Sequence, residues 1–237
     1  MSEAPAAPNG SVAAISSPVA ASSFLYGLLA ECFAYPDDDL IESIRRGDLR
    51  RRIEQIASAV DAGLLGGLDL APLHDPGAML EPLAVEYSRL FDAGVRGTAC
   101  SLNGGVHHGP QMKVMEEVVR YYNHFGLAMT DDNRELPDHL TAELGFLHFL
   151  AFGEQQLETA GRSVADYQRA QRDFIARHPG RWLPVMWRAL EPLHAMPFFT
   201  LLTQLLLRLL TSEQARLEGL HGAADLKPSA AIPFGGI

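Results

Sequence analysis

The stretch PDHLTAELGFLHFLAFGEQQ, residues 137–156, decides the fold. Its proline suits the first turn of a helix, because that position needs no backbone N–H donor. Leucines recur around it with helical spacing and share one stripe: Leu136, Leu140, Leu144 and Leu147. The other faces are apolar too, since they carry Phe146, Phe149, Leu150 and Phe152. A helix that is apolar all round is buried, so this segment is expected to be the central helix of a core.

Helical periodicity extends outward from this segment through most of the chain. The first helix is expected to run from Ser22 or Ser23, as N-cap, to Phe33, before Tyr35-Pro36 ends it. Further helices are expected at about residues 37–46, 49–60, 78–92, 110–125, 163–178, 182–191 and 197–217, with loops at 61–77 and 93–109. No strand or hairpin signals occur. The sequence predicts an all-α fold, a single globular helical domain of about eight or nine helices over residues 22–218. A disordered tail (1–21) precedes it and a loose tail (219–237) follows it.

The charge balance restricts the possible partners. The chain has 19 Lys and Arg residues against 29 Asp and Glu residues, a formal net charge of −10. Nucleic-acid binding depends on neutralising phosphates with basic side chains, so this class is disfavoured, as is attachment to anionic lipid. A basic peptide, in contrast, would be attracted.

Three further features favour a reducing, aqueous compartment. Cys32 and Cys100 permit one disulfide arithmetically, but two reduced thiols are the simpler expectation. The first 21 residues lack both the basic and the apolar region of a secretory signal. The most apolar stretch, residues 198–210, is too short to span a bilayer and contains Gln204 and Arg208. The protein is therefore expected to be cytoplasmic.

Metal and enzyme functions have only partial support. His107 and His108 are adjacent, and His139 and Glu143 share a helix face, but no third ligand follows at helical spacing. Cys100 could form a nucleophile pair with His107 or His108. Neither a phosphate-binding loop nor a GxSxG motif is present. No metal, no cofactor and no catalytic residues are expected.

Two other patterns each have a plain structural interpretation. Tyr87, Leu90 and Phe91 share one helix face, which alone is typical of core packing. The turn Pro137-Asp138-His139 precedes a helix, and an acidic residue in a first turn is favoured by the helix dipole. Between them lies a glycine-rich loop, residues 93–109.

Together these patterns resemble a known family. Glu86-Tyr87-Ser88-Arg89-Leu90-Phe91, residues 115–126 and Pro137-Asp138-His139-Leu140 with Glu143-Leu144 are similar to the redox-enzyme maturation chaperones, the TorD/NarJ-like group. The resemblance covers about residues 23–210 in the same order. The loop at residues 100–110 departs from the family's proline-rich loop. It looks more like the branch that serves type II enzymes of the dimethyl-sulfoxide-reductase family.

The resemblance implies a cytoplasmic chaperone that is not itself an enzyme. Such a chaperone binds the apo catalytic subunit of a molybdenum oxidoreductase, often through its twin-arginine signal peptide, until the molybdopterin cofactor is inserted. Carried over to this sequence, the client-binding residues are Tyr87, Leu90, Phe91, Pro137, Asp138, His139 and Glu143. Asp138 would pair with an arginine, and His139 would orient Asp138 or contact the peptide. The chaperone is expected to be a monomer or weak dimer. A helical adaptor for a folded partner is the alternative.

Overall fold

The computed structural model describes residues 17–92, 98–128 and 135–226. Within these ranges the regular elements are helical, and the predicted all-α class is confirmed. The helices are α1 (Pro18–Cys32), α2 (Asp38–Arg45), α3 (Asp48–Val60), α4 (Leu80–Phe91), α5 (Gly104–His107), α6 (Gln111–His124), α7 (Leu140–Thr159), α8 (Ala165–Arg177), α9 (Pro179–Leu190) and α10 (Pro197–His221). Two 3₁₀ turns, η2 (Ala71–Leu73) and η3 (Glu191–Leu193), complete the order. None of the described helices is long and apolar enough to cross a bilayer.

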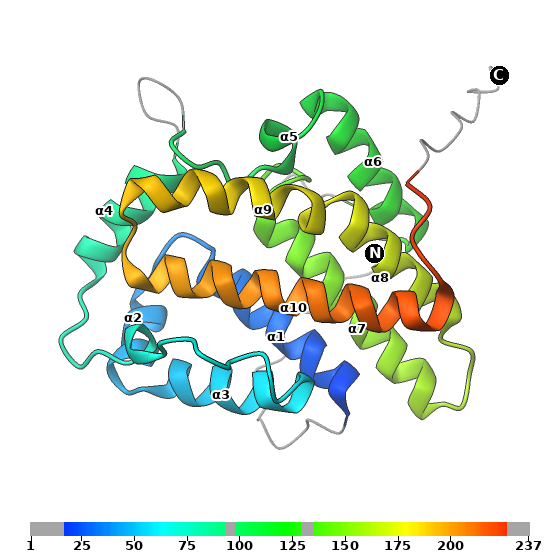
Figure 1. Ribbon diagram of the computed structural model, residues 1–237, viewed down its shortest axis with the longest axis horizontal. Coiled ribbons are helices and arrows are strands. Elements are labelled where there is room, and N and C mark those ends of the chain that lie inside the picture. Colours follow the sequence, from blue (N-terminus) through cyan, green and yellow to red (C-terminus); the bar gives the residue numbers. More distant parts are fainter. Residues whose placement is uncertain (1–16, 93–97, 129–134, 227–237) are drawn as a thin grey trace.

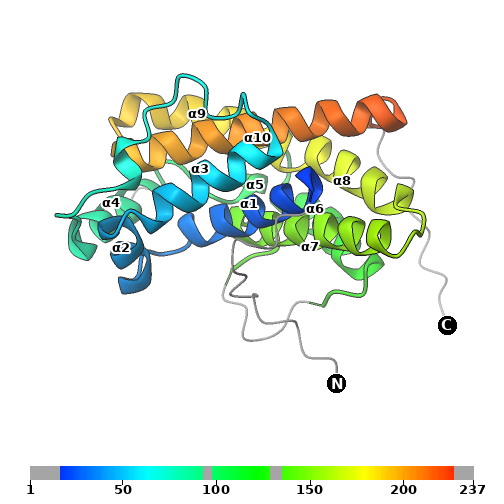
Figure 2. The ribbon, with the colours of Figure 1, turned by 90° about the horizontal axis from the view of Figure 1, so that it is seen from below.

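The helices pack in layers around one continuous apolar core (Figures 1 and 2). α1 lies against α7 on one side and α3 on the other, while α10 packs against α8 and α9. α9 and α10 run side by side along the long axis of the molecule (Figure 1). The short α5 packs against α6 and α9, at the edge of the molecule. At this edge α5 meets the turn Pro137-Asp138-His139 that the sequence singled out.

The chain enters the fold earlier than the sequence predicted. α1 begins at Pro18, and the Ser17 hydroxyl caps it by accepting from the Ala20 N–H at 3.2 Å. Ala20 and Ala21 are buried, so residues 18–21 belong to the first helix of the fold rather than to a tail. Residues 1–16 and 227–237 lie outside the described ranges. At the other end, α10 extends to His221, past the expected end at residue 217.

The central helix begins later than its proline suggested. His139 is the N-cap of α7, so Pro137 and Asp138 precede the helix and Asp138 is not in its first turn. Leu136 is 46% exposed, and so is Phe152, which corrects the expectation of an apolar surface buried on every side. Leu140, Leu144 and Leu147 are fully buried as predicted. Elsewhere, α8 starts after Val164 rather than at Ser163, and the expected loop at 93–109 contains α5.

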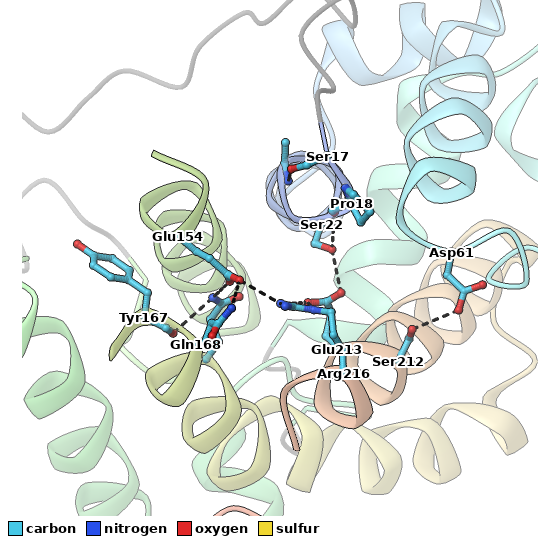
Figure 3. A network of polar contacts seen from close by, with 12 residues as sticks. Ser17, Pro18, Ser22, Asp61, Glu154, Tyr167, Gln168, Ser212, Glu213 and Arg216 are labelled. Carbon is cyan, nitrogen blue, oxygen red and sulfur yellow. Dashed lines mark hydrogen bonds and ion pairs between the residues drawn. The ribbon is translucent and has the colours of Figure 1, made fainter. Parts of the chain in front are cut away.

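A buried polar network joins four helices at the far end of the core (Figure 3). Arg216 on α10 lies between two buried carboxylates: Glu154 of α7, at 3.3 Å, and Glu213 of α10, at 2.8 Å. Ser22 of α1 donates to Glu213 at 2.9 Å, and Gln171 of α8 donates to Glu154 at 2.6 Å. Buried charges are tolerated only when they are paired and hydrogen-bonded, so this network fixes how α1, α7, α8 and α10 meet.

Candidate functional site

Asp138 is the centre of the Pro137-Asp138-His139 turn, and its side chain is fully buried. One carboxylate oxygen accepts from the Gly105 N–H at 2.9 Å, and the other accepts from the Asn103 side-chain amide at 3.3 Å. Its backbone carbonyl accepts from the Gly104 N–H at 2.8 Å. The first N–H groups of a helix have no acceptor within the helix, and at the N-terminus of α5 Asp138 supplies acceptors for two of them. The carboxylate predicted to bind an arginine is engaged inside the protein.

The two glycines of α5 are required by close approach. A Cβ on Gly105 would stand 2.7 Å from the Gln111 side chain and 2.8 Å from an Asp138 oxygen. On Gly104 it would stand 2.7 Å from Nε1 of Trp182. Gly104 and Gly105, which the sequence placed in a glycine-rich loop, are thus packed tightly between the turn before α7 and helix α9.

Glu143 and Trp182 form the second layer of the site. Glu143 is fully buried, and one of its oxygens accepts from the Trp182 indole N–H at 2.9 Å. Burial raises the pKa of Glu143 well above its usual value, the hydrogen bond from Trp182 opposes this shift, and the nearby Asp138 charge adds to it. The His107 ring stacks on Trp182, with ring centres 5.3 Å apart and planes 2° apart. Sequence reasoning missed Trp182, because a tryptophan in a helical pattern looks like any core residue.

His139 acts as a helix cap rather than as a partner for Asp138. Its Nδ1 accepts from the Thr141 N–H at 3.3 Å, and it lies 2.7 Å from the Thr141 hydroxyl. Nε2 points to Glu135, 3.6 Å from a carboxylate oxygen. Burial lowers the pKa of His139, while the Glu135 and Asp138 charges raise it. The neutral tautomer with the proton on Nε2 satisfies both contacts.

The face formed by Tyr87, Leu90 and Phe91 packs into the core. Leu90 is fully buried, and the rings of Tyr87 and Phe91 are 5.2 Å apart. The Tyr87 hydroxyl donates to the Phe33 carbonyl at 3.2 Å. The backbone N–H of Cys100 donates to the Leu90 carbonyl at 2.8 Å, which ties this face to the segment that leads into α5. The two halves of the predicted site are therefore connected through residues 100–105.

Exposed residues border both halves of this site. Tyr35, 58% exposed, stands edge-on to Tyr87 with ring centres 5.4 Å apart. Leu136 and Glu135 are exposed at the turn before α7, and Val106 is exposed on α5. The sequence placed Leu136 on a buried stripe and assigned none of these residues to the site, because nothing in its pattern shows which apolar side chains remain uncovered.

The remaining chemical candidates are occupied by structural contacts. The Cys100 thiol donates to the Met186 carbonyl at 3.5 Å, and burial raises its pKa to about 11. His107 pairs with the Ser101 carbonyl and His108 with the Gly104 carbonyl. A thiol with so high a pKa is a poor nucleophile. Cys32 and Cys100 are both free and buried. Across the described ranges, no three potential metal-ligating side chains gather at one point.

Replacing Asp138 by alanine is expected to lower the free energy of unfolding by about 2 kcal/mol, because the buried Gly105 N–H loses its acceptor. Asp138→Asn keeps an acceptor oxygen and should cost less. Denaturant unfolding measures both changes, and amide hydrogen exchange at Gly105 localises them. Unchanged exchange at Gly105 in Asp138→Ala would contradict the capping role.

Comparisons with known proteins identify the family of this chain. The profile of the family described as nitrate reductase delta subunit matches residues 48–188. The chain belongs to this family.

Three curated relatives are similar over most of their length. The selenate reductase assembly chaperone protein of Thauera selenatis is 36% identical over 58% of this chain and 72% of its own. The chlorate reductase assembly chaperone protein of Ideonella dechloratans is 32% identical, over 70% and 75%. The perchlorate reductase assembly chaperone protein of Dechloromonas aromatica (strain RCB) is 32% identical, over 78% and 84%. These relatives confirm the predicted family and class: a maturation chaperone rather than an enzyme.

Proposed function

We propose that this protein holds the apo catalytic subunit of a molybdenum oxidoreductase of the dimethyl-sulfoxide-reductase family until the client's cofactor has been inserted. The observation that carries the proposal is the similarity to the selenate, chlorate and perchlorate reductase chaperones, at 32–36% identity. They act on reductases of oxyanions, which favours a client of the type II branch. The chaperone works in the cytoplasm, as a monomer or weak dimer, before the client is exported.

The client-binding region includes the two predicted motifs and the surface above them. Tyr87, Leu90 and Phe91 stabilise one side from within, and Pro137, Asp138, His139 and Glu143 stabilise the other. Because Asp138 and Glu143 are fully buried, they act by holding α5 and its neighbours in place. Direct contact with the client falls to exposed neighbours such as Tyr35, Leu136 and Val106. A signal peptide needs an apolar surface for its hydrophobic stretch and negative potential for its arginines, and the net charge of −10 supplies the latter.

Affinity capture from the native host tests this function. The tagged chaperone is expressed in cells grown with molybdate and in cells in which cofactor synthesis is blocked, and captured proteins are identified by mass spectrometry. The apo catalytic subunit should be strongly enriched when the cofactor is missing, because the chaperone releases its client after insertion. Equal capture of cofactor-loaded and apo subunit, or capture of no molybdenum oxidoreductase subunit, would contradict the proposal.

A further inference from the structure

A cavity of about 390 Å³ lies where α1, α2 and α3 meet. Leu28, Cys32, Leu40 and Leu49 supply the apolar part of its lining, and Tyr35 also lines it. Its volume falls within the range of about 300–1,000 Å³ that is typical of small-ligand sites. α2 lies at one end of the molecule, and α3 runs from there toward the middle, against α1 (Figure 2).

The charges that line this cavity are unbalanced. They comprise the carboxylates of Glu31, Asp37 and Asp39 and the guanidinium of Arg52. Arg52 lies 3.8 Å from Glu31, and Asp37 caps α2 by accepting from the Leu40 N–H at 2.8 Å. In the part of the chain that the structure describes, the carboxylate of exposed Asp39 makes no hydrogen bond or ion pair. The cavity therefore combines an apolar lining with an excess of negative charge, which is complementary to a cation on an aliphatic stem.

Tyr35 connects this cavity to the proposed client-binding region. Its ring packs edge-on against Tyr87, and 58% of its surface remains exposed. The Tyr87 hydroxyl is held by the Phe33 carbonyl, so the ring beneath Tyr35 has a fixed position. An exposed tyrosine ring beside carboxylates attracts a guanidinium through both the ring face and the charge. Arginine meets these requirements better than lysine, because its planar group can stack and pair at once.

We propose that the cavity between α1, α2 and α3 receives an arginine side chain of the client segment, with the guanidinium between Asp39 and Tyr35. The stem lies along the apolar lining, where Leu28 and Leu40 shield it from water. This inference rests on the proposed chaperone function and specifies how a basic signal segment is recognised. It adds to the client-binding region a subsite that neither predicted motif contains.

The helix dipole offers a simpler explanation for the acidic residues. Asp38 and Asp39 both lie in the first turn of α2, where negative charge is stabilising whether or not a ligand binds. Asp38, however, is not among the cavity-lining residues. Asp38 therefore provides a matched control for Asp39. Asp38→Asn and Asp39→Asn each remove one charge from the first turn of α2, but only Asp39→Asn removes a charge from the cavity.

Calorimetric titration of the full chain with synthetic peptides tests the proposal. The probe is an acetylated, amidated peptide with two adjacent arginines followed by an apolar stretch of leucine and alanine. Matched peptides carry lysine or glutamine in place of both arginines. We expect Asp39→Asn and Tyr35→Leu to weaken binding of the arginine peptide by about fivefold or more, and Asp38→Asn to change it by less than about twofold. The glutamine peptide should bind the parent and all three variants equally weakly.

Thermal melts of the same variants monitor folding, and the two aspartate variants should melt alike. Equal affinity of Asp39→Asn and Asp38→Asn for the arginine peptide would overturn the cavity assignment, because the effect would then be a general one of net charge. A parent protein that binds the arginine and glutamine peptides equally well would overturn it too. Capture of the apo catalytic subunit by Asp39→Asn in cofactor-deficient cells is a separate readout. If the parent captures that subunit while the peptide results fail, the chaperone function stands and the arginine subsite does not.

Discussion

Arg216→Ala is expected to lower the free energy of unfolding by about 3 kcal/mol, because it leaves two buried carboxylates without their shared cation. Glu154 and Glu213 are 2% and 3% exposed, so both depend on partners within the protein. The Arg216 side chain is itself 28% exposed, which places the expected cost at the lower end for a buried pair. Denaturant unfolding followed by circular dichroism measures the change.

Two variants separate charge from packing and from surface pairing. Arg216→Met keeps an aliphatic stem but removes the charge, so it should be nearly as destabilising as alanine. Arg169→Ala breaks an exposed pair with Asp166 on α8 and should cost less than about 1 kcal/mol. If Arg216→Met were as stable as the parent protein, the charge of Arg216 would not hold the four helices together.

The core helices could be predicted from the sequence because their apolar positions repeat with helical spacing. Leu140, Leu144 and Leu147 illustrate this, since each is fully buried on α7 as expected. Helix ends were less predictable. Ser17 caps α1 inside a stretch whose composition resembles a tail, and the single turn α5 is too short for any periodicity.

Long-range polar contacts could not be predicted, because sequence spacing does not reveal them. Asp138 meets Gly105 across 33 residues, and Trp182 meets Glu143 across 39. Glu213 and Arg216 illustrate the same limit: three residues apart, they resemble an ordinary surface pair until α1, α7 and α8 cover them. The two motifs were recognisable as family features, but only the structure shows that the carboxylates of Asp138 and Glu143 are buried.

Acid should destabilise this protein through His178, which lies 1% exposed at the junction of α8 and α9. Burial, together with the positive charges of His108, Arg177 and Arg181, lowers the pKa of His178 to about 3. Neither ring nitrogen has a hydrogen-bond partner among the described residues, and the ring packs 4.8 Å from Phe174 and 5.6 Å from Tyr121, centre to centre.

The direction of the effect follows from proton binding. Between pH 3 and about pH 6.5 the unfolded chain binds a proton at this histidine and the folded chain does not. Stability therefore falls as the pH falls through this window, by up to roughly 5 kcal/mol at about 1.4 kcal/mol for each pKa unit. Glu143 has the opposite effect on stability, because its pKa is raised in the folded state. Above the ordinary pKa of a glutamate, the unfolded chain releases this proton while the folded chain still holds it, so stability is lost as the pH rises.

His178→Phe isolates the contribution of the histidine. Phenylalanine retains the contacts with Phe174 and Tyr121 and removes two buried nitrogens that lack partners in the described structure, so stability at pH 7 should be equal or higher. The loss of stability between pH 6.5 and pH 4 should become distinctly smaller than in the parent, while the opposing effect of Glu143 is present in both proteins and cancels in the difference. His124→Gln, at an exposed histidine on α6, provides the control and should follow the parent at every pH. Parallel pH profiles for the parent and His178→Phe, measured by urea unfolding at half-unit intervals, would show that His178 is not the group that makes this core acid-sensitive.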